Sequence, residues 1–147
     1  MGNILLYSEL FGTLFLVGNA LTHRGNLHLQ STGVSVVQWQ LCAALSQRPE
    51  KSANLSTLAA QLCTSRQNIK QVAQGLMMKG WLRMEKDPAD SRALLLALTP
   101  ECEEFWDRRV TIDRDFLVST FGSFADDELQ ETIGVLQRLY KRLEGSV

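Results

Sequence analysis

The chain has 147 residues, the length of one ordinary globular domain or of a dimer-forming unit built on one small module. Its apolar content of 45% is enough for a packed core, so the composition is that of a globular protein. The formal net charge of −1 does not by itself indicate a nucleic-acid partner.

The charge is unevenly distributed along the chain. Residues 54–99 contain six Lys or Arg against three acids, a local net charge of +3, whereas the remaining residues carry nine bases and thirteen acids. The positive charge is therefore concentrated in one central segment, as in a nucleic-acid-binding module.

Residues 4–21 form an apolar stretch that could be read as a membrane span or a signal peptide. No basic residue precedes this stretch, and Glu9 interrupts it, which disfavours both readings. Its large side chains recur at steps of three and four, which predicts an amphipathic helix. One short domain can hardly cover that face, so we expect the helix to form half of a dimer interface and not to enter a membrane.

A polar, glycine-bounded break is expected at residues 26–33, and a second helix begins near Val36 and ends before Pro49. Residues 48–53 are expected to form a loop. This loop leads to Asn54, whose side-chain oxygen can cap the next helix.

Residues 54–80 have the pattern of two helices in quick succession. A short helix with Leu55 and Leu58 inside is followed by a polar break at residues 63–65 and then by a longer helix with Ile69, Val72 and Leu76 inside. Thr64 is the expected N-cap of the longer helix, with Gln67 at capping-box spacing. Gly80, after Lys79, is its expected C-terminal stop.

A β-hairpin is predicted next, with strands at residues 81–86 and 93–99. Asp87-Pro88 initiates the turn between them, and Leu94, Leu96 and Leu98 alternate onto one face. Two close-set helices followed by a hairpin form a winged helix-turn-helix. The expected fold is thus mainly α with a small β-hairpin wing.

In these segments the chain resembles the MarR family of bacterial transcriptional regulators. The similarity lies in the helix pair from Leu55 to Gln67, in residues 76–82, and most specifically in Asp90, Arg92 and the alternating leucines that end in Leu98-Thr99. The resemblance implies a homodimeric regulator, acting as a repressor, that binds double-stranded DNA at a pseudo-palindromic operator.

In a helix-turn-helix, the first turns of the second helix reach base edges in the major groove. Arg66 can fork onto guanine, Gln67, Asn68 or Gln71 can pair with adenine, and Lys70 suits a phosphate. The full set of helical candidates is Ser65, Arg66, Gln67, Asn68, Lys70, Gln71 and Gln74. The alternative is that this polar stripe is only a solvated helix face, but it contains no acid and is rich in Gln and Asn.

The wing supplies further candidates. Asp90 and Arg92 are two residues apart and, on an extended chain, project to the same side, so the carboxylate can hold the guanidinium in place for a minor groove. The resemblance implies the same role for Arg92. The alternative is an exposed ion pair of little energetic value. Arg83 and Lys86 are expected to contact the DNA backbone.

Two more helices are expected after the wing. One begins at Thr99-Pro100-Glu101 and runs towards Phe121, and a last one carries apolar residues at steps of four and three from Leu129 to Leu143. Residues 1–33 and 101–147 are thus the expected dimerisation helices, and residues 34–100 the DNA-binding lobe. The resemblance also implies a small lipophilic or phenolic effector, in a cleft that would be lined by Phe11, Phe15, Trp39 and Phe105.

The sequence carries no pattern that indicates an enzyme, a cofactor or a metal site. His23 and His28 are five residues apart, and three cysteines without a Cys-x-x-Cys pair fit a reducing cytoplasm. Cys42 and Cys63 are expected to be buried on apolar helix faces, which leaves Cys102 as the most open thiol. Two alternatives therefore stay open: a redox-sensing regulator switched at Cys102, and a winged-helix protein-interaction module with no DNA role.

Overall fold

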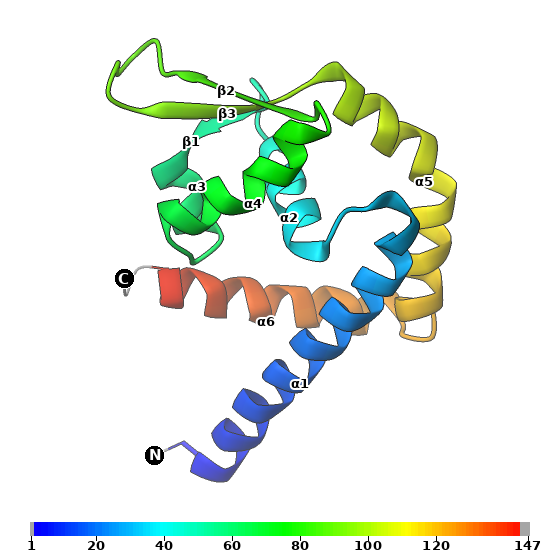
Figure 1. Cartoon of the computed structure of the whole chain (residues 1–147). Coiled ribbons are helices and arrows are strands. Elements are labelled where there is room, and N and C mark those ends of the chain that lie inside the picture. Colours follow the sequence, from blue (N-terminus) through cyan, green and yellow to red (C-terminus); the bar gives the residue numbers. More distant parts are fainter. Residues whose placement is uncertain (1, 145–147) are drawn as a thin grey trace. The chain divides into compact units, whose positions relative to one another are not determined.

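The computed structural model describes residues 2–144, which form helices and one small sheet (Figure 1). The chain divides into two compact units, Met1–Gln40 and Leu41–Val147. The elements in chain order are α1 (Ile4–Leu29), η1 (Gln30–Thr32), α2 (Val36–Ser46), β1 (Ser52–Asn54), α3 (Leu55–Gln61), α4 (Arg66–Met78), β2 (Leu82–Lys86), β3 (Leu94–Leu98), α5 (Pro100–Phe121) and α6 (Asp126–Glu144). The mainly helical winged-helix prediction is confirmed. The assignment of roles to residues 1–33, 34–100 and 101–147 stays a prediction.

The first unit contains one long helix, α1, and the turn that follows it. Asn3 caps α1 by accepting hydrogen bonds from the backbone N–H groups of Leu5 and Leu6. The break expected at residues 26–33 was placed too early, because α1 continues to Leu29. The Asn26 side chain does not interrupt the helix. Instead its Oδ1 accepts the Val36 N–H at 2.8 Å, which caps the start of α2.

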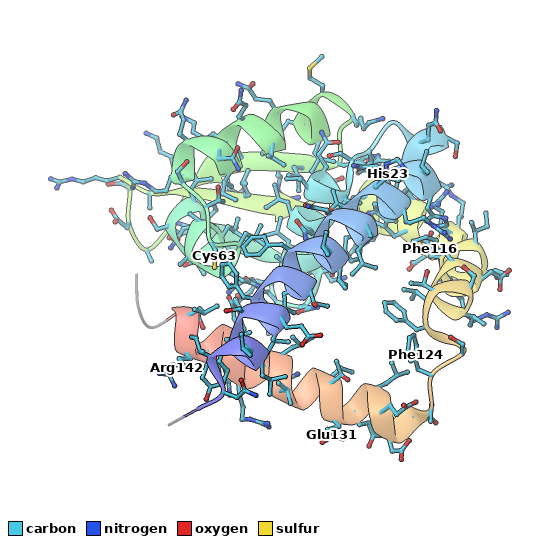
Figure 2. All side chains as sticks on the ribbon, turned by 90° about the horizontal axis from the view of Figure 1, so that it is seen from below. His23, Cys63, Phe116, Phe124, Glu131 and Arg142 are labelled. Atoms are coloured by element: carbon cyan, nitrogen blue, oxygen red, sulfur yellow. The ribbon has the colours of Figure 1, made fainter. Side chains whose placement is uncertain are left out.

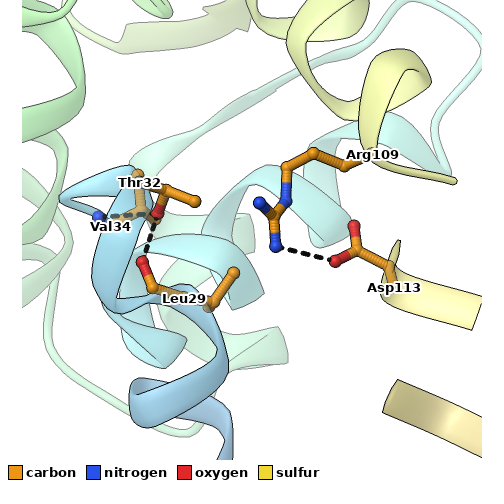
Figure 3. Close-up of polar contacts among 5 residues, drawn as sticks. All are labelled: Leu29, Thr32, Val34, Arg109 and Asp113. Carbon is orange, nitrogen blue, oxygen red and sulfur yellow. Dashed lines mark hydrogen bonds and ion pairs between the residues drawn. The ribbon is translucent and has the colours of Figure 1, made fainter. Parts of the chain in front are cut away.

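The turn after α1 is held by one hydroxyl group. Thr32 Oγ1 donates to the Leu29 carbonyl at 2.6 Å and accepts the Val34 N–H at 3.0 Å (Figure 3). Gly33 then adopts a left-handed conformation with φ of 70°. The actual break is therefore residues 30–35, and it leads directly into α2.

The second unit is built around the helix pair α3 and α4. Asn54 caps α3 as predicted, with its Oδ1 accepting the Thr57 N–H at 2.8 Å. Helix α4 ends in a Schellman motif, in which Trp81 N–H donates to Leu76 O and Gly80 N–H donates to Met77 O. Gly80 has a φ of 73°, so the predicted glycine stop is confirmed.

The sheet has three antiparallel strands in the order β1-β3-β2. The hairpin of β2 and β3 matches the predicted wing, and Arg83 pairs with Ala97 in the register. The third strand, β1, was expected to be loop. Only three residues long, it pairs with β3 from Ser52 opposite Ala97 to Asn54 opposite Leu95, and so shows no sequence alternation of its own.

The core of the second unit lies where α2, α3, α4 and the sheet bring their apolar side chains together. Ile69, Ala73 and Leu76 are the buried residues of α4, and Leu58 is fully buried on α3. Each fully buried large side chain contributes about 1.5–3 kcal/mol. On β3 the predicted alternation is incomplete, because Ala97 is buried as well as Leu96 and Leu98.

The wing leads into α5, which then connects to α6 through residues 122–125. Arg109 and Asp113 form an ion pair one turn apart on α5, with Nη2 and Oδ1 separated by 3.0 Å (Figure 3). The C-terminal part of α6 returns to α3, where the Tyr140 hydroxyl donates to the Gln61 carbonyl at 2.8 Å.

Most of the large apolar side chains that are exposed lie on α1, α5 and α6. On α6 these are Ile133, Val135, Leu136, Tyr140 and Leu143, on α5 they include Val110, Ile112, Leu117 and Val118, and on α1 they run from Ile4 to Leu27. By length and composition alone, α1 could also cross a membrane. Apolar surface of this extent marks a contact surface.

The left-handed conformation of Gly80, the residue after the C-cap Lys79, generates a stability prediction. A Cβ at this position would meet no other atom, so Gly80→Ala should act through backbone strain alone and lower the free energy of unfolding by about 1–2 kcal/mol. Urea denaturation of both proteins measures this difference.

Gly80→Asn is the matched control, because asparagine tolerates the left-handed region better than alanine. It should cost less than Gly80→Ala. Equal stability of wild type and Gly80→Ala would contradict the left-handed conformation.

Candidate nucleic-acid interface

A concavity of about 620 Å³ lies between the start of α3, the first turns of α4 and the wing. It is lined by Asn54, Leu55, Ser56, Arg66, Gln67, Lys70, Asp90, Arg92, Ala93 and Leu94. Three of these side chains are cationic and one is anionic. The net positive charge of the lining, together with its amide and hydroxyl groups, fits a polyanion better than an apolar ligand.

The helix α4 presents its polar side chains outward. Arg66, Gln67, Lys70, Gln71 and Gln74 are exposed, whereas the opposite face is buried. Of these five, Arg66, Gln67 and Lys70 line the concavity, and they are three of the residues expected to read or hold DNA. Gln71 and Gln74 lie further along the same helix, outside the concavity.

The start of α4 lies one residue later than expected. Ser65, not Thr64, is the N-cap, and its Oγ accepts the Asn68 N–H at 3.1 Å. The Thr64–Gln67 capping box is therefore wrong: Thr64 lies before the cap, where its hydroxyl accepts a hydrogen bond from Asn68 Nδ2 at 2.9 Å. The bond to Thr64 uses one of the two N–H donors of the Asn68 amide, so its oxygen and its second N–H are left to contact a base.

Asp90 contributes to the wing in a different way from that predicted. Its carboxylate Oδ1 accepts the backbone N–H of Arg92 at 3.0 Å, and its own N–H donates to the Asp87 carbonyl. Residues 90–92 form a turn rather than an extended strand, so the alternation rule that paired the two side chains does not apply. Asp90 thus shapes the wing tip, and the exposed Arg92 side chain lines the concavity.

The two other basic wing residues lie on β2, outside the concavity. Arg83 Nε is 3.5 Å from Glu85 Oε2, and both side chains are about half exposed, so this ion pair is weak. Lys86 is exposed at the end of the strand. Neither residue is placed with Arg66, Lys70 and Arg92.

Sequence reasoning did not identify the start of α3 as part of the site. Asn54 was expected only as a helix cap, but Asn54, Leu55 and Ser56 form one edge of the concavity. The signal was available, because the first helix of a helix-turn-helix crosses the DNA backbone while the second enters the groove.

The four residues expected to line an effector cleft have different surroundings. Phe11 and Phe15 lie on α1, stack edge to face at 5.0 Å, and are exposed, and Trp39 is also exposed. Phe105, in the second unit, packs against Trp81 at 4.3 Å between ring centroids. The effector cleft therefore stays a prediction.

The cysteines are arranged differently from the expectation. Cys63 is exposed in the turn after α3, with a φ of 51° (Figure 2), because the helix ends before it could lie on an apolar face. Cys102, expected to be the most open thiol, is fully buried, with its sulfur 4.0 Å from that of the buried Cys42. Their hydrogen bond, together with burial, raises the pKa of Cys42. It lowers the pKa of Cys102, but that thiol has no exposed surface.

The described residues contain no group of three or more His, Cys, Asp or Glu side chains that could hold a metal ion. The polar residues of the concavity are amides, a hydroxyl, guanidinium groups, an ammonium and one carboxylate. This set suits hydrogen bonding and charge pairing with an extended anionic partner.

Comparison with known proteins finds transcriptional regulators. No family model matches the chain. The chain is 25% identical over 142 residues to the transcriptional activatory protein BadR of Rhodopseudomonas palustris, covering 95% of this chain and 81% of that protein.

Two solved structures extend the comparison to the fold. AbsC, a MarR family transcriptional regulator from Streptomyces coelicolor, matches with a TM-score of 0.82 at 21% identity, over 94% of each chain. Sco3205, a MarR family regulator from the same organism solved in complex with DNA, matches with a TM-score of 0.77 at 22% identity, over 90% of this chain and 83% of that one. The predicted resemblance is confirmed at the level of the fold.

The exposure of the three thiols generates a test by alkylation. Iodoacetamide should modify one cysteine per native chain, Cys63, because only a solvent-accessible thiolate reacts. Mass spectrometry of the native and the denatured protein should show one and three modified residues, respectively. Modification of Cys102 before Cys63 would contradict the burial described.

Proposed function

On the premise that the chain has the fold of the MarR family of transcriptional regulators, we propose that it is a sequence-specific DNA-binding regulator of transcription. The observation that carries this proposal is the concavity in which Arg66 and Lys70 of the recognition helix meet Arg92 of the wing. Two DNA-contacting elements thus present their cations to the same space. The Sco3205 complex with DNA supports the same partner for this fold.

In the proposed complex, α4 enters a major groove. Arg66 and Gln67, in its first turn, are placed to contact base edges, and each good bidentate contact contributes about 1–3 kcal/mol of discrimination. Lys70 pairs with a phosphate. Arg92, at the wing tip, enters the adjacent minor groove, where a narrow A-rich segment deepens the negative potential that attracts arginine. Ser65, Asn68, Gln71 and Gln74 extend the α4 surface, and Arg83 and Lys86 are secondary backbone contacts.

We further propose that the regulator is a homodimer. The exposed apolar side chains of α1, α5 and α6 supply surface for a second copy. A two-fold dimer sets two recognition helices about one DNA turn, ~34 Å, apart and so reads a pseudo-palindromic operator. A helix pairing with a second copy also accounts for the apolar face of α1 without a membrane.

We propose that the regulator is a cytoplasmic protein without enzymatic activity and that it acts as a repressor. A dimer bound across a promoter excludes RNA polymerase from that promoter. BadR is an activatory protein, so a promoter fusion compared in the presence and absence of the gene decides the direction. Release by a small lipophilic or phenolic effector is part of the proposal. Such a ligand shifts DNA affinity only by its differential affinity for the two forms.

Two alternative functions, a redox sensor and a protein-interaction module, can be distinguished from the proposed DNA-binding regulator. Redox sensing through Cys102 is disfavoured by the complete burial of that side chain. A protein-interaction module without a DNA role would show no steep salt dependence, whereas a DNA reader loses about 0.9 log units of affinity per phosphate contact for each tenfold rise in salt.

Arg92→Ala is the variant that tests the wing. It should weaken operator binding at least about tenfold, and it should reduce the salt dependence by about one contact if the guanidinium neutralises a phosphate. Fluorescence anisotropy with labelled operator at several salt concentrations measures both quantities.

Arg108→Ala is the matched control, because Arg108 is exposed on α5 and lies outside the concavity. This variant should bind as wild type does. Equal losses from both substitutions would indicate a nonspecific charge effect and would contradict the wing assignment.

The dimer proposal is tested on α6. Ile133 is 53% exposed, and Ile133→Lys should place an unpaired charge in the interface and weaken dimerisation by at least about tenfold. Glu131 is two residues from Ile133 on the same helix, and with 3.6 residues per turn it faces the other side, so Glu131→Lys should leave the dimer intact. Sedimentation velocity over a concentration series distinguishes the two, and a monomeric wild type would contradict the proposal.

A further inference from the structure

The end of the recognition helix α4 and the start of α5 are joined directly, although nineteen residues separate Gly80 from Thr99. The Thr99 hydroxyl donates to the Gly80 carbonyl at 2.6 Å, and the Thr99 N–H donates to the Trp81 carbonyl at 3.0 Å. Both acceptors belong to the two residues that follow Lys79, the C-cap of α4, and Thr99 is the N-cap residue of α5.

The hydroxyl of Thr99 is used in an unusual way. At a helix N-cap, a threonine hydroxyl ordinarily accepts a backbone N–H of its own helix. Here Thr99 makes no side-chain cap bond to α5 and instead donates across to α4. The Thr99 hydroxyl therefore does not cap its own helix, α5, and instead connects the start of α5 to the end of α4.

Aromatic packing strengthens the same connection. The Trp81 ring, only 9% exposed, lies 4.3 Å from Phe105 and 5.9 Å from Trp106 between centroids, and both partners belong to α5. Lys79 Nζ also lies 5.5 Å from the Trp81 ring centroid. Gly80 and Trp81, the two residues whose N–H groups close the Schellman motif, are thus held against α5 by a hydroxyl, a backbone bond and packed rings.

We propose that Thr99 and Trp81 are positioning residues for DNA recognition: they fix the orientation of α4 on α5 and so set the operator half-site spacing that the dimer accepts. This inference rests on the proposed function, in which α5 belongs to the dimer interface. Neither residue lines the concavity, so each acts through α4 and not by touching DNA.

The physical reason is that the two recognition helices are related only through the interface. If α4 can tilt on α5, the distance between the two α4 helices varies, and several spacings become acceptable. If α4 is fixed, an inserted base pair moves one half-site by about 3.4 Å and rotates it by about a tenth of a turn, and one of the two lobes loses its contacts.

Thr99→Val is the decisive variant, because it removes the donor and keeps the branched shape of the side chain. Thr99→Ser keeps the hydroxyl and is the matched control. Affinities of the full-length dimers are measured for the operator and for the same DNA with one base pair inserted at its centre. The readout is the dissociation constant for the DNA with the insertion divided by that for the native operator. Thermal denaturation of each protein measures its stability.

Wild type and Thr99→Ser should share a high ratio, with at least about a tenfold preference for the native spacing. Thr99→Val should bind the native operator several-fold more weakly, and its ratio should fall by at least about threefold. Phe105→Leu, which removes the ring against Trp81, should lower the ratio in the same direction. Thr99→Val should remain folded, because Gly80 is exposed and water can reach its carbonyl. Phe105→Leu should remain folded, because Phe105 is only half-buried and leucine keeps the position apolar.

An unchanged ratio in Thr99→Val and Phe105→Leu would overturn the inference, including the case in which stability and affinity fall together, since a merely structural role does not alter spacing preference. Failure of the proposed function gives a different result: wild type itself would then bind no operator, whatever its spacing.

Discussion

The structure of the second unit depends on the burial of one side of α4. Ile69, Ala73 and Leu76 pack into the core, and this fixes the rotation of the helix about its own axis. The opposite side must then face solvent, and the exposed positions between Arg66 and Gln74 are all Arg, Lys, Gln or Asn, without a single carboxylate. The same hydrophobic contact that stabilises the lobe therefore also presents its cationic and amide side chains to a partner.

The wing completes the site because the hairpin is fixed at its base. Leu82 and Leu98 are buried at the end of the hairpin nearest the core, whereas the tip, where Asp90 and Arg92 lie, is exposed. An anchored base and an exposed tip let a short β-hairpin carry a cation away from the core without losing its register. The concavity between tip and α4 is the result.

Features with strong local periodicity were predictable from the sequence. The two helices, their apolar faces, the glycine stop at Gly80 and the hairpin each follow from spacing and turn chemistry. The cap of α4 was misplaced by one residue because Thr64 and Ser65 can both cap a helix, and the prediction favoured Thr64 for its capping-box spacing to Gln67, although serine is the better cap.

Other features depend on contacts distant in sequence and could not be read from it. The burial of Cys102 depends on its packing against Cys42 across 60 residues, and β1 exists only because β3 lies beside it. On the assumption of an extended backbone, the Asp90 carboxylate was expected to pair with the Arg92 guanidinium. Residues 90–92 form a turn, and the carboxylate accepts the Arg92 backbone N–H instead.

The decisive measurement is a titration of the purified protein against the DNA upstream of its own gene, with excess unrelated DNA present and at two salt concentrations. A DNA-binding dimer should show saturable binding of two chains per site that survives the competitor and weakens steeply as salt rises. Absence of binding to any DNA at low salt would contradict the proposed function, and the concavity between α4 and the wing would then need a partner other than DNA.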